Sequence, residues 1–302
     1  MARQNERKPP RVSVVILNWN GRHLLGPCLD SMQAQTCKDF EIVLADNGSS
    51  DGSLEMVRKK YPKVRIVDNG ANLGFADGNN KAVATCRGEF VALLNNDTVA
   101  KADWLACLVQ AADKAPSRTA SFASRMMLID NRDVVNSAGI MLLKDGGGRD
   151  RFAFVPLAGI AEGGKADGGL KSGDVAGACG GAVLFRREAL EAVKDGDDDY
   201  LESQFFMYFE DVDLAYRLLW AGYSSRYVHE AVVYHHGSAS AKKITHKRIE
   251  FGQLNRLRVM ARNFTARMLL ANLPWIAARQ VLEFFYFTIR YASLSPLAAQ
   301  RA

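Results

Sequence analysis

The sequence lacks the paired-cysteine spacing of a zinc site or a disulfide framework. Its five cysteines are scattered, odd in number and nowhere arranged as CxxC. We therefore expect reduced thiols that act as small apolar side chains, as in a cytosolic protein. The polar and basic stretch from Met1 to Arg11 is followed by only a short apolar segment, Val12 to Leu17. That segment is too short for the core of a signal peptide, so we do not expect export.

Other absences narrow the function classes. No uncharged apolar window reaches the roughly 18 residues that span a bilayer. The pattern GxGxxG is missing after the first apolar segment, which excludes a Rossmann dehydrogenase. The net charge of +6 is modest for 302 residues, and no basic–aromatic recognition pattern accompanies it, so nucleic acid is not an expected partner. The positive charge instead suits a polyanionic ligand or an anionic membrane surface.

The first hundred residues contain an alternation of short apolar segments and helical patterns. The apolar segments are rich in β-branched side chains and are predicted to be strands: 12–17, 41–45, 64–67 and 90–94. Such alternation predicts βαβ units, and therefore an α/β fold with a mostly parallel sheet. With 48% apolar residues, a chain of this length can bury an ample core.

Each predicted strand ends in asparagine, aspartate or glycine, as at Asn18, Asp46 and Asp97. The carboxyl ends of parallel strands share one edge of a sheet, where ligands of open α/β folds bind. A nucleotide suits such a polar rim, because Asp46 can accept from a base N–H and the loop 72–80 offers amides and a helix N-terminus to phosphates. Taken singly, each cluster is equally typical of a polar loop.

Asp97 closes the last of these segments in an Asn-Asn-Asp turn. A carboxylate at this place can hold a hard divalent cation against phosphate oxygens. An ordinary Asx-type turn after a buried strand gives the same pattern. The two interpretations of this turn stay open on its sequence alone.

Three acids follow an aromatic run, 205–209, and begin a helical pattern: Glu210, Asp211 and Asp213. Acidic residues are common at helix N-termini because they complement the helix dipole. Three acids behind an aromatic wall are more than that role requires. A carboxylate partly desolvated by such a wall has a raised pKa and can act as a general base.

Two adjacent histidines, His235 and His236, follow a predicted strand pair at 226–228 and 231–234. A lone histidine is more often a structural hydrogen-bonding group than a ligand. Two at a strand end, in a chain with five, are candidates for a metal site. Because a strand sends neighbouring side chains to opposite faces, only one of them is expected to enter the site.

The segment 144–174 is glycine-rich and charged, with little periodicity. Predicted strands in 121–143, with a turn at 136–139, precede it. A long unpatterned loop inside a compact domain is usually functional or disordered. We interpret this one as a mobile lid or acceptor-side loop, with a disordered insertion as the alternative.

The C-terminal segment 242–302 differs in kind from the rest. Its first part is strongly basic, and apolar stretches follow at 268–278 and 284–289. A basic segment beside an aromatic-rich amphipathic helix suits peripheral attachment to a membrane. Packing on the core or on a second subunit is the alternative, so an oligomer stays possible. One helical stripe carries Leu282, Phe285, Tyr286 and Ile289.

Six motifs occur in order along the chain: Val14 to Gly21, Asp46 to Ser49, Asn72 to Ala76, Leu94 to Asp97, Phe209 to Leu214 and His235 to Ser240. Together they resemble a family 2 glycosyltransferase of the GT-A fold, in its bacterial rhamnosyltransferase-like branch. The resemblance extends over about residues 12–265 and rests on the ordered set, since each motif alone is unspecific.

The resemblance implies a Rossmann-like, mostly parallel sheet flanked by helices, with a helical, amphipathic C-terminal extension. It implies a GT-A catalytic domain over 1–241, with a nucleotide-binding half at about 12–100 and an acceptor-side half at about 101–241, followed by the segment 242–302. The donor would be a nucleoside-diphosphate sugar (a dTDP- or UDP-sugar), with rhamnose as one candidate. The acceptor would be a saccharide or polyprenyl-linked saccharide in cell-envelope polysaccharide synthesis. The expected place of work is the cytoplasm, at the inner face of the cytoplasmic membrane.

The metal site follows from the same resemblance. The turn ending at Asp97 occupies the place of the family's Asp-x-Asp motif, with Asn95 in place of its first acid. Asp97 would therefore carry the coordination of Mg²⁺ or Mn²⁺, helped by one histidine, His235 or His236.

The other roles are also implied by the resemblance. Asn18 and Asp46 would bind the base and ribose. Asp211 matches the general base, and Glu210 would orient it or the acceptor. One base without a positioned protein nucleophile predicts a single displacement that inverts the anomeric carbon. The residues assigned to the nucleotide sugar are Asn18, Asn20, Asp46, Asn47, Asn72, Gly74, Phe75, Asn79, Asn95 and Asn96.

Two other function classes stay open. A sugar-nucleotide pyrophosphorylase needs a glycine-rich, Arg/Lys-bearing phosphate loop after the first strand, whereas Asn18 to Gly21 supplies one glycine. A membrane-docked scaffold that keeps the fold without the chemistry is suggested by Asn95. The carboxylates Asp97 and Asp211, with the two histidines, favour an enzyme.

Overall fold

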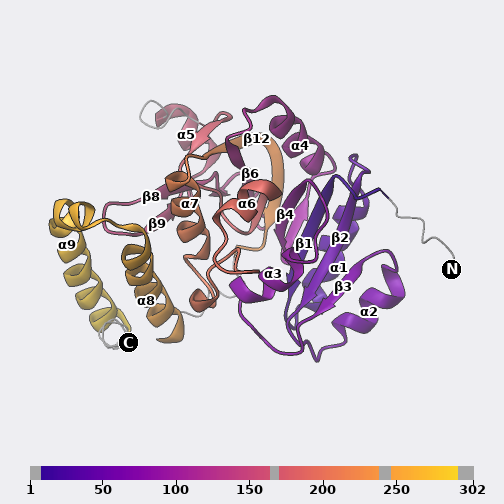
Figure 1. Cartoon of the computed structure of the whole chain (residues 1–302), viewed down its shortest axis with the longest axis horizontal. Coiled ribbons are helices and arrows are strands. Elements are labelled where there is room, and N and C mark those ends of the chain that lie inside the picture. Colours follow the sequence, from indigo (N-terminus) through magenta and orange to yellow (C-terminus); the bar gives the residue numbers. More distant parts are fainter. Residues whose placement is uncertain (1–7, 164–169, 238–245, 292–302) are drawn as a thin grey trace.

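A mixed sheet forms the centre of the molecule (Figure 1). The computed structural model describes residues 8–163, 170–237 and 246–291. Within these ranges the strands are β1 Val12–Asn18, β2 Phe40–Asp46, β3 Arg65–Asp68, β4 Phe90–Asn95, β5 Thr98–Ala100, β6 Thr119–Leu128, β7 Val135–Ser137, β8 Ile140–Leu142, β9 Gly148–Asp150, β10 Gly173–Val175, β11 Ala182–Arg186 and β12 Ser224–His235. The order in the sheet is β10-β12-β6-β11-β4-β1-β2-β3, with β5 beside β12 and β7 beside β6, while β8 and β9 form a separate pair.

The helices connect these strands and cover the sheet. They are α1 Arg22–Gln33, α2 Ser53–Lys60, α3 Ala76–Val83, α4 Trp104–Lys114, α5 Leu157–Gly163, α6 Arg187–Val193, the 3-10 turn η1 Ser203–Phe205, α7 Glu210–Trp220, α8 His246–Asn263 and α9 Ala266–Tyr291. None of the helices in the described ranges combines the length and the hydropathy of a membrane span.

Residues 12–100 have the predicted α/β fold. β1 is parallel to both β2 and β4, and β2 is parallel to β3. These are the four strands expected from the apolar segments. β11 is antiparallel to β4 and to β6, which joins the second half of the chain to the same sheet.

Alternate residues of β1 supply two apolar faces. Val14 and Ile16 belong to the cluster that includes apolar side chains of α1, α2 and α4. Val15 belongs to the opposite cluster, with side chains of α3, α6 and α7. A strand covered on both faces has a continuous apolar sequence, which is the pattern seen here.

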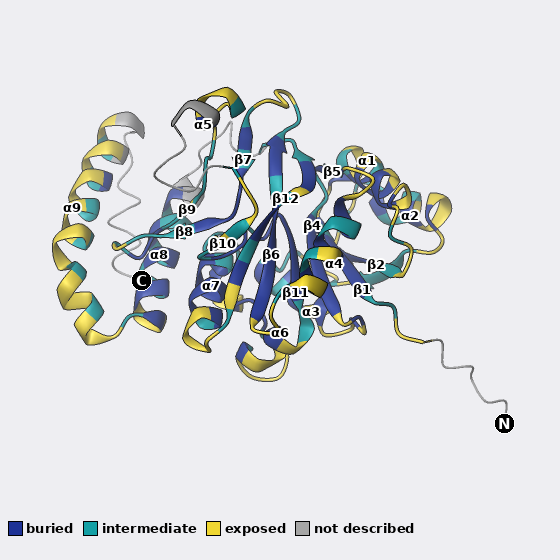
Figure 2. Cartoon of the chain, turned by 90° about the horizontal axis from the view of Figure 1, so that it is seen from above, coloured by how far each residue is buried: buried dark blue, intermediate teal, exposed yellow. Residues whose placement is uncertain are grey.

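The two C-terminal helices lie beyond α7 at one end of the molecule, and α9 is the outer one (Figure 1). α8 is tied to α7 because Asn263 Nδ2 donates to Asp213 Oδ1 at 2.7 Å and Arg262 Nε donates to the same oxygen at 3.1 Å. α9 contacts α8 through Glu283, which accepts from Gln253. Most of α9 is exposed along its length (Figure 2).

Three expectations about local structure are wrong. The predicted strand pair at 226–228 and 231–234 is one strand, β12, whose pairing with β6 shifts register between Val228 and Val232. A bulge accommodates the polar residues His229 and Glu230, which lie between the two predicted strands.

The predicted unpatterned loop, 144–174, contains β9, α5 and the start of β10; residues 164–169 lie outside the described part of the chain. The predicted turn at 136–139 also differs, because Asn136 and Ser137 belong to β7. β8 and β9 are three residues long each and β9 begins at a glycine, so they leave too little periodicity to be predicted.

Candidate active site

A cavity of about 540 Å³ lies where both halves of the chain meet at the sheet edge. The loop after β4, the end of β12 and the first turn of α7 contribute to its wall. The structure therefore brings Asp97 and Asp211 to one cavity. The lining residues used below are Phe75, Asn95, Asp97, Asn136, Asp150, Gly180, Tyr208, Phe209, Glu210, Asp211 and His235.

The pairing of β5 with β12 places Asp97 beside His235. Thr98 opens β5 and is the register partner of His235, so Asp97 directly precedes a paired residue. His235 Nε2 lies 3.1 Å from Asp97 Oδ1. The backbone N–H of His236 donates to the carbonyl oxygen of Asp97 at 3.0 Å. Of the two histidines, His235 lines the cavity, and the contact of His236 with Asp97 is made by its backbone.

Asn136 of β7 fixes the orientation of the His235 ring. Its Oδ1 lies 2.8 Å from His235 Nδ1. Since an amide oxygen only accepts, Nδ1 carries the hydrogen, and Nε2 faces Asp97. A neutral imidazole nitrogen and a carboxylate oxygen at this separation repel each other unless a proton or a cation lies between them.

The Asp97–His235 pair fits a divalent cation. Ligands at neighbouring positions of an octahedral ion, each about 2.1 Å from it, lie about 3 Å apart, close to the separation found here. Carboxylates suit Mg²⁺ and Mn²⁺, and imidazole suits the transition metals. The described part of the chain contains no group of three or more His, Cys, Asp or Glu side chains that could hold a metal. A cation bound by this pair would therefore complete its shell with water or ligand oxygens, such as those of a diphosphate.

Asp211 lies in the first turn of α7 and lines the cavity. Its Oδ2 accepts a hydrogen bond from the backbone N–H of Gly180 at 3.1 Å. Burial raises the pKa of Asp211, and the negative charge of nearby Asp150 raises it further. A carboxylate with a raised pKa is a better proton acceptor than a surface aspartate. Asp211 can therefore take a proton from a hydroxyl group in the cavity.

Glu210, the neighbour of Asp211, is buried, and its Oε2 has no hydrogen-bond partner among the described residues. Burial raises the pKa of Glu210, and the negative charge of Asp211 adds to the effect. Two adjacent buried carboxyls resist carrying two negative charges. Glu210 therefore favours its protonated form, which leaves the charge of the pair on Asp211.

The loop before α7 has an unusual backbone. φ is 58° at Phe206, 69° at Tyr208 and 73° at Phe209, in the left-handed region that non-glycine residues rarely occupy. Gly74 packs against this loop with φ of 79°, and a Cβ there would lie 2.3 Å from the carbonyl oxygen of Phe206. Only glycine fits that position. Backbone strain of this kind clusters at functional sites, and Tyr208 and Phe209 line the cavity.

Part of the predicted nucleotide rim is a hydrogen-bonded cluster. Asn18 Nδ2 donates to Asp46 Oδ1 and to Ser49 Oγ, each at 3.1 Å. Asn18 Oδ1 accepts from Asn96 Nδ2 at 2.8 Å. Gly21 lies against this cluster, where a Cβ would be 2.3 Å from Asn96 Nδ2. The structure thus brings Asn18, Asp46 and Asn96 together at the carboxyl edge of β1, β2 and β4.

Other predicted nucleotide contacts brace the loops. Asn47 Nδ2 donates to the carbonyl oxygen of Gly74 at 2.8 Å, and Asn72 Oδ1 accepts from the Gly74 N–H at 3.0 Å. Asn79 Nδ2 donates to the carbonyl four residues before it, and Asn20 Oδ1 accepts from a backbone N–H of the loop after β2. Their contact with a nucleotide stays a prediction.

Two polar cavity residues, Asn136 and Asp150, were not predicted. Asp150 ends β9, and its Oδ1 accepts from Ser137 Oγ at 2.6 Å. Burial raises the pKa of Asp150. Both residues reach the site through short strands whose pairing the sequence did not indicate, so their residue type was the only signal.

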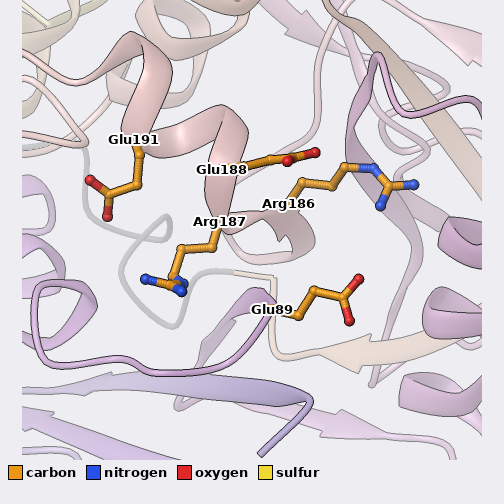
Figure 3. Close-up of a pocket in the computed structure, with 5 residues that line it drawn as sticks. All are labelled: Glu89, Arg186, Arg187, Glu188 and Glu191. Atoms are coloured by element: carbon orange, nitrogen blue, oxygen red, sulfur yellow. The ribbon is translucent and has the colours of Figure 1, made fainter. Parts of the chain in front are cut away.

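A second cavity, of about 510 Å³, is lined by charged side chains (Figure 3). Arg186 donates to the carbonyl oxygens of Thr119 and Ala112, and Arg187 donates to that of Gly88. Glu89 directly precedes β4, so this cavity lies at the amino end of that strand, away from the carboxyl edge that carries Asp97. Its lining residues are Glu89, Arg186, Arg187, Glu188 and Glu191.

The fold is similar to that of several solved glycosyltransferases. A mannosyltransferase from Pyrobaculum calidifontis, in complex with GDP-Man and Mn²⁺, aligns with a TM-score of 0.59 over 97% of this chain and 79% of its own, at 19% identity. GalNAc-T7 with UDP, GalNAc and Mn²⁺ aligns with a TM-score of 0.61 over 85% of this chain and 48% of its own, at 18% identity. The chain has the GT-A fold with C-terminal helices added.

Sequence relatives agree with the fold. An N-acetylglucosaminyl-diphospho-decaprenol L-rhamnosyltransferase of Mycobacterium tuberculosis is 31% identical over 244 residues, which cover 75% of this chain and 76% of that protein. An uncharacterized protein of Sinorhizobium fredii is 28% identical over 251 residues, and the match spans only 25% of its length. Residues 13–194 match the pattern of Glycosyl transferase family 2. The chain therefore belongs to glycosyl transferase family 2.

Proposed function

We propose that the protein transfers a sugar from a nucleoside-diphosphate sugar to an acceptor hydroxyl, with inversion and with the help of Mg²⁺ or Mn²⁺. The observation that carries the proposal is that Asp97 with His235 and Asp211 line one cavity. The two carboxylates then have separate roles in one reaction, one toward the donor and one toward the acceptor. Asp97 holds the cation on the donor side, and Asp211 serves the acceptor.

The reaction breaks the bond between the anomeric carbon and the diphosphate, whose oxygen keeps the electron pair. A divalent cation, when bound, stabilises the negative charge of that leaving group. The acceptor oxygen forms the new bond to the anomeric carbon as its proton passes to Asp211. Glu210, protonated beside it, keeps the charge of the pair on Asp211.

The Asn18–Asp46–Asn96 cluster is the proposed site for the base and ribose. Its position at the carboxyl edge of the parallel strands supports this role, because nucleotides bind there in α/β folds. Asn95 and Phe75 line the cavity between this cluster and Asp211. We place the diphosphate and the transferred sugar along that path.

The sequence relatives support a particular donor and acceptor. The Mycobacterium tuberculosis relative is named for L-rhamnosyl transfer to N-acetylglucosaminyl-diphospho-decaprenol. By likeness to it, we propose rhamnose as the sugar and a polyprenyl-linked saccharide as the acceptor, in cell-envelope polysaccharide synthesis. UDP-sugars are the other donor class, since a similar solved structure, Staphylococcus aureus TarS, binds UDP-GlcNAc.

The exposed face of α9 supports attachment to the inner face of the cytoplasmic membrane. Large apolar side chains on this helix are exposed, among them Leu270, Trp275, Leu282 and Ile289. Aromatic and aliphatic side chains on one amphipathic helix suit the interface of a bilayer. A lipid-linked acceptor would be presented at that surface.

A panel of nucleotide-sugars tests the proposal. We expect one dTDP- or UDP-sugar to raise the melting temperature in the presence of Mn²⁺ or Mg²⁺, and to do so less with EDTA. The same donor should be hydrolysed slowly in a metal-dependent reaction without acceptor. Binding without metal-dependent turnover of any donor, with or without a polyprenyl-linked acceptor, would instead indicate a scaffold that keeps the fold alone.

A further inference from the structure

Asn255, in the middle of α8, is fully buried and donates to three backbone carbonyls of one loop. Its Nδ2 lies 2.8 Å from the carbonyl oxygen of Phe205 and 2.9 Å from those of Met207 and Tyr208. Two amide hydrogens are shared among three acceptors. This one side chain therefore bonds to three of the five backbone carbonyls of the loop 205–209, just before α7.

The orientation of this amide is fixed. Arg258 donates through Nη1 to Asn255 Oδ1 at 3.1 Å, and the same nitrogen donates to the carbonyl oxygen of Gln204. A reversed amide would set Asn255 Oδ1 against three carbonyl oxygens. The Arg258 donor on one side and the loop carbonyls on the other therefore both require that Nδ2 of Asn255 faces the loop.

The loop held by Asn255 is the one with the left-handed backbone at Phe206, Tyr208 and Phe209. Such a conformation persists only where the surroundings determine it. On its other side, the carbonyl oxygen of Phe206 accepts from the backbone N–H groups of Phe75 and Ala76. The loop is thus hydrogen-bonded to α8 on one side and to the start of α3 on the other.

This loop delivers the proposed base. Tyr208 and Phe209 are followed at once by Glu210 and Asp211, and all four line the cavity. A loop that relaxed its left-handed turns would move the N-terminus of α7, and the Asp211 carboxylate with it. Displacements of about 1 Å at a reacting group cost on the order of 10²-fold in rate.

We propose that Asn255 is a positioning residue of the active site, whose amide holds the loop 205–209 in the conformation that presents Asp211 to the acceptor. The inference rests on the proposed role of Asp211 as general base. It makes α8, which lies outside the family match at 13–194, a structural part of the active site.

A matched control lies two residues away on the same helix. Gln253 is also a buried amide, and its hydrogen bonds go to Glu283 of α9 and to Arg256. Replacing either amide by an apolar side chain of similar size removes buried hydrogen bonds, so both Asn255→Leu and Gln253→Met should lower the melting temperature. Only Asn255→Leu should affect catalysis.

The experiment measures kcat, donor KM and the pH profile of kcat for both variants. For Asn255→Leu we expect kcat to fall on the order of 10²-fold. Donor KM should stay near that of the wild type, because the proposed donor site, at Asp97 and the Asn18–Asp46–Asn96 cluster, does not include the loop 205–209. A loosened loop admits water to Asp211, so the acid limb of the kcat profile should move to lower pH. Gln253→Met should keep the kcat and the pH profile of the wild type.

Wild-type kcat and pH profile in folded Asn255→Leu, or an equal loss of kcat in Gln253→Met, would overturn the inference. If Asn255→Leu does not fold, Arg258→Met replaces it, because Arg258 is only partly buried and orients the same amide. We then expect a smaller fall in kcat with the same shift of the acid limb, and wild-type behaviour would overturn the inference. Asp211→Asn is assayed in parallel. Normal transfer by Asp211→Asn would refute the proposed function. An inactive Asp211→Asn together with a fully active Asn255→Leu would refute only the role of Asn255.

Discussion

Asp97 and Asp211 line one cavity although they come from different halves of the chain. Asp97 lies in the turn between β4 and β5, and Asp211 lies in the first turn of α7. Asp97 is next to an imidazole, whereas Asp211 is next to two other carboxyl groups, Glu210 and Asp150. The difference in their neighbours suits Asp97 to a cation and Asp211 to a proton.

The transfer rate should depend on the protonation of Asp211. Because burial and Asp150 raise the pKa of Asp211, the base form is lost at higher pH than for an ordinary aspartate, and kcat should fall as the pH is lowered through that raised pKa. Asp150→Asn removes a negative charge, so the acid limb should move to lower pH. The control is Asp113→Asn, an exposed position on α4, which should leave the profile in place. An unmoved acid limb in Asp150→Asn would show that another group controls it.

Stability should respond to Glu210 in the opposite direction from that of a salt-bridged acid. A folded-state pKa above the unfolded value means that the folded protein holds a proton that the unfolded chain releases, so the free energy of unfolding falls as the pH rises between the two values. Glu210→Gln removes this dependence, and each unit of pKa shift removed corresponds to ~1.4 kcal/mol. We expect the melting temperature of the variant to equal that of the wild type below the ordinary pKa of glutamate, about 4.5, and to exceed it increasingly as the pH rises toward the raised pKa of Glu210, about 8. A difference in melting temperature that narrows with rising pH would contradict a raised pKa of Glu210.

Asn136 should control metal affinity through the ring of His235. Asn136→Leu frees the tautomer and the rotation of the imidazole, and losses of this kind cost about 10–100-fold in metal affinity. Calorimetric titration of Mn²⁺ in the presence of the nucleoside diphosphate measures it directly. Asn131→Leu, at an exposed position beyond β6, serves as the control. Equal affinity in both variants would exclude His235 as an oriented ligand.

Binding to membranes should depend on the exposed face of α9. Trp275→Ser and Leu282→Ser each remove a large exposed apolar side chain from this helix, and should lower the fraction that floats with vesicles containing anionic lipid. Trp19→Ser removes a similarly exposed side chain from the loop after β1 and should leave flotation unchanged. If all three variants float as the wild type does, α9 has another partner.

Much of the fold of residues 12–100 could be predicted from the sequence, because its signals are local. The mostly apolar segments at 12–17 and 90–94 are typical of strands covered on both faces, and the carboxyl ends of parallel strands share one edge of the sheet. Asp97 and Asp211 each lie within three residues of a strong apolar or aromatic pattern, and the roles proposed for them come from the resemblance to family 2 glycosyltransferases.

The remaining parts of the site depend on contacts that no local pattern encodes. Asn136 reaches His235 through the pairing of β7 with β6, and Asp150 lies on the short strand β9. Asn255 is one amide in a basic helix, and its function depends on a loop some 50 positions earlier in the chain. Asn79 carries the right chemistry for a phosphate, yet in the fold its side chain donates to the carbonyl oxygen of Phe75 at the start of its own helix, α3.

In the proposed mechanism two carboxylates of one cavity have different roles: Asp97 binds the donor through the cation, and Asp211 removes the proton. The most direct test is the transfer rate of Asp211→Asn measured together with its affinity for the metal–nucleotide-sugar. For Asp211→Asn we expect wild-type donor affinity and a transfer rate lower by ~10²–10⁴-fold. Near-normal transfer at normal donor affinity would contradict it.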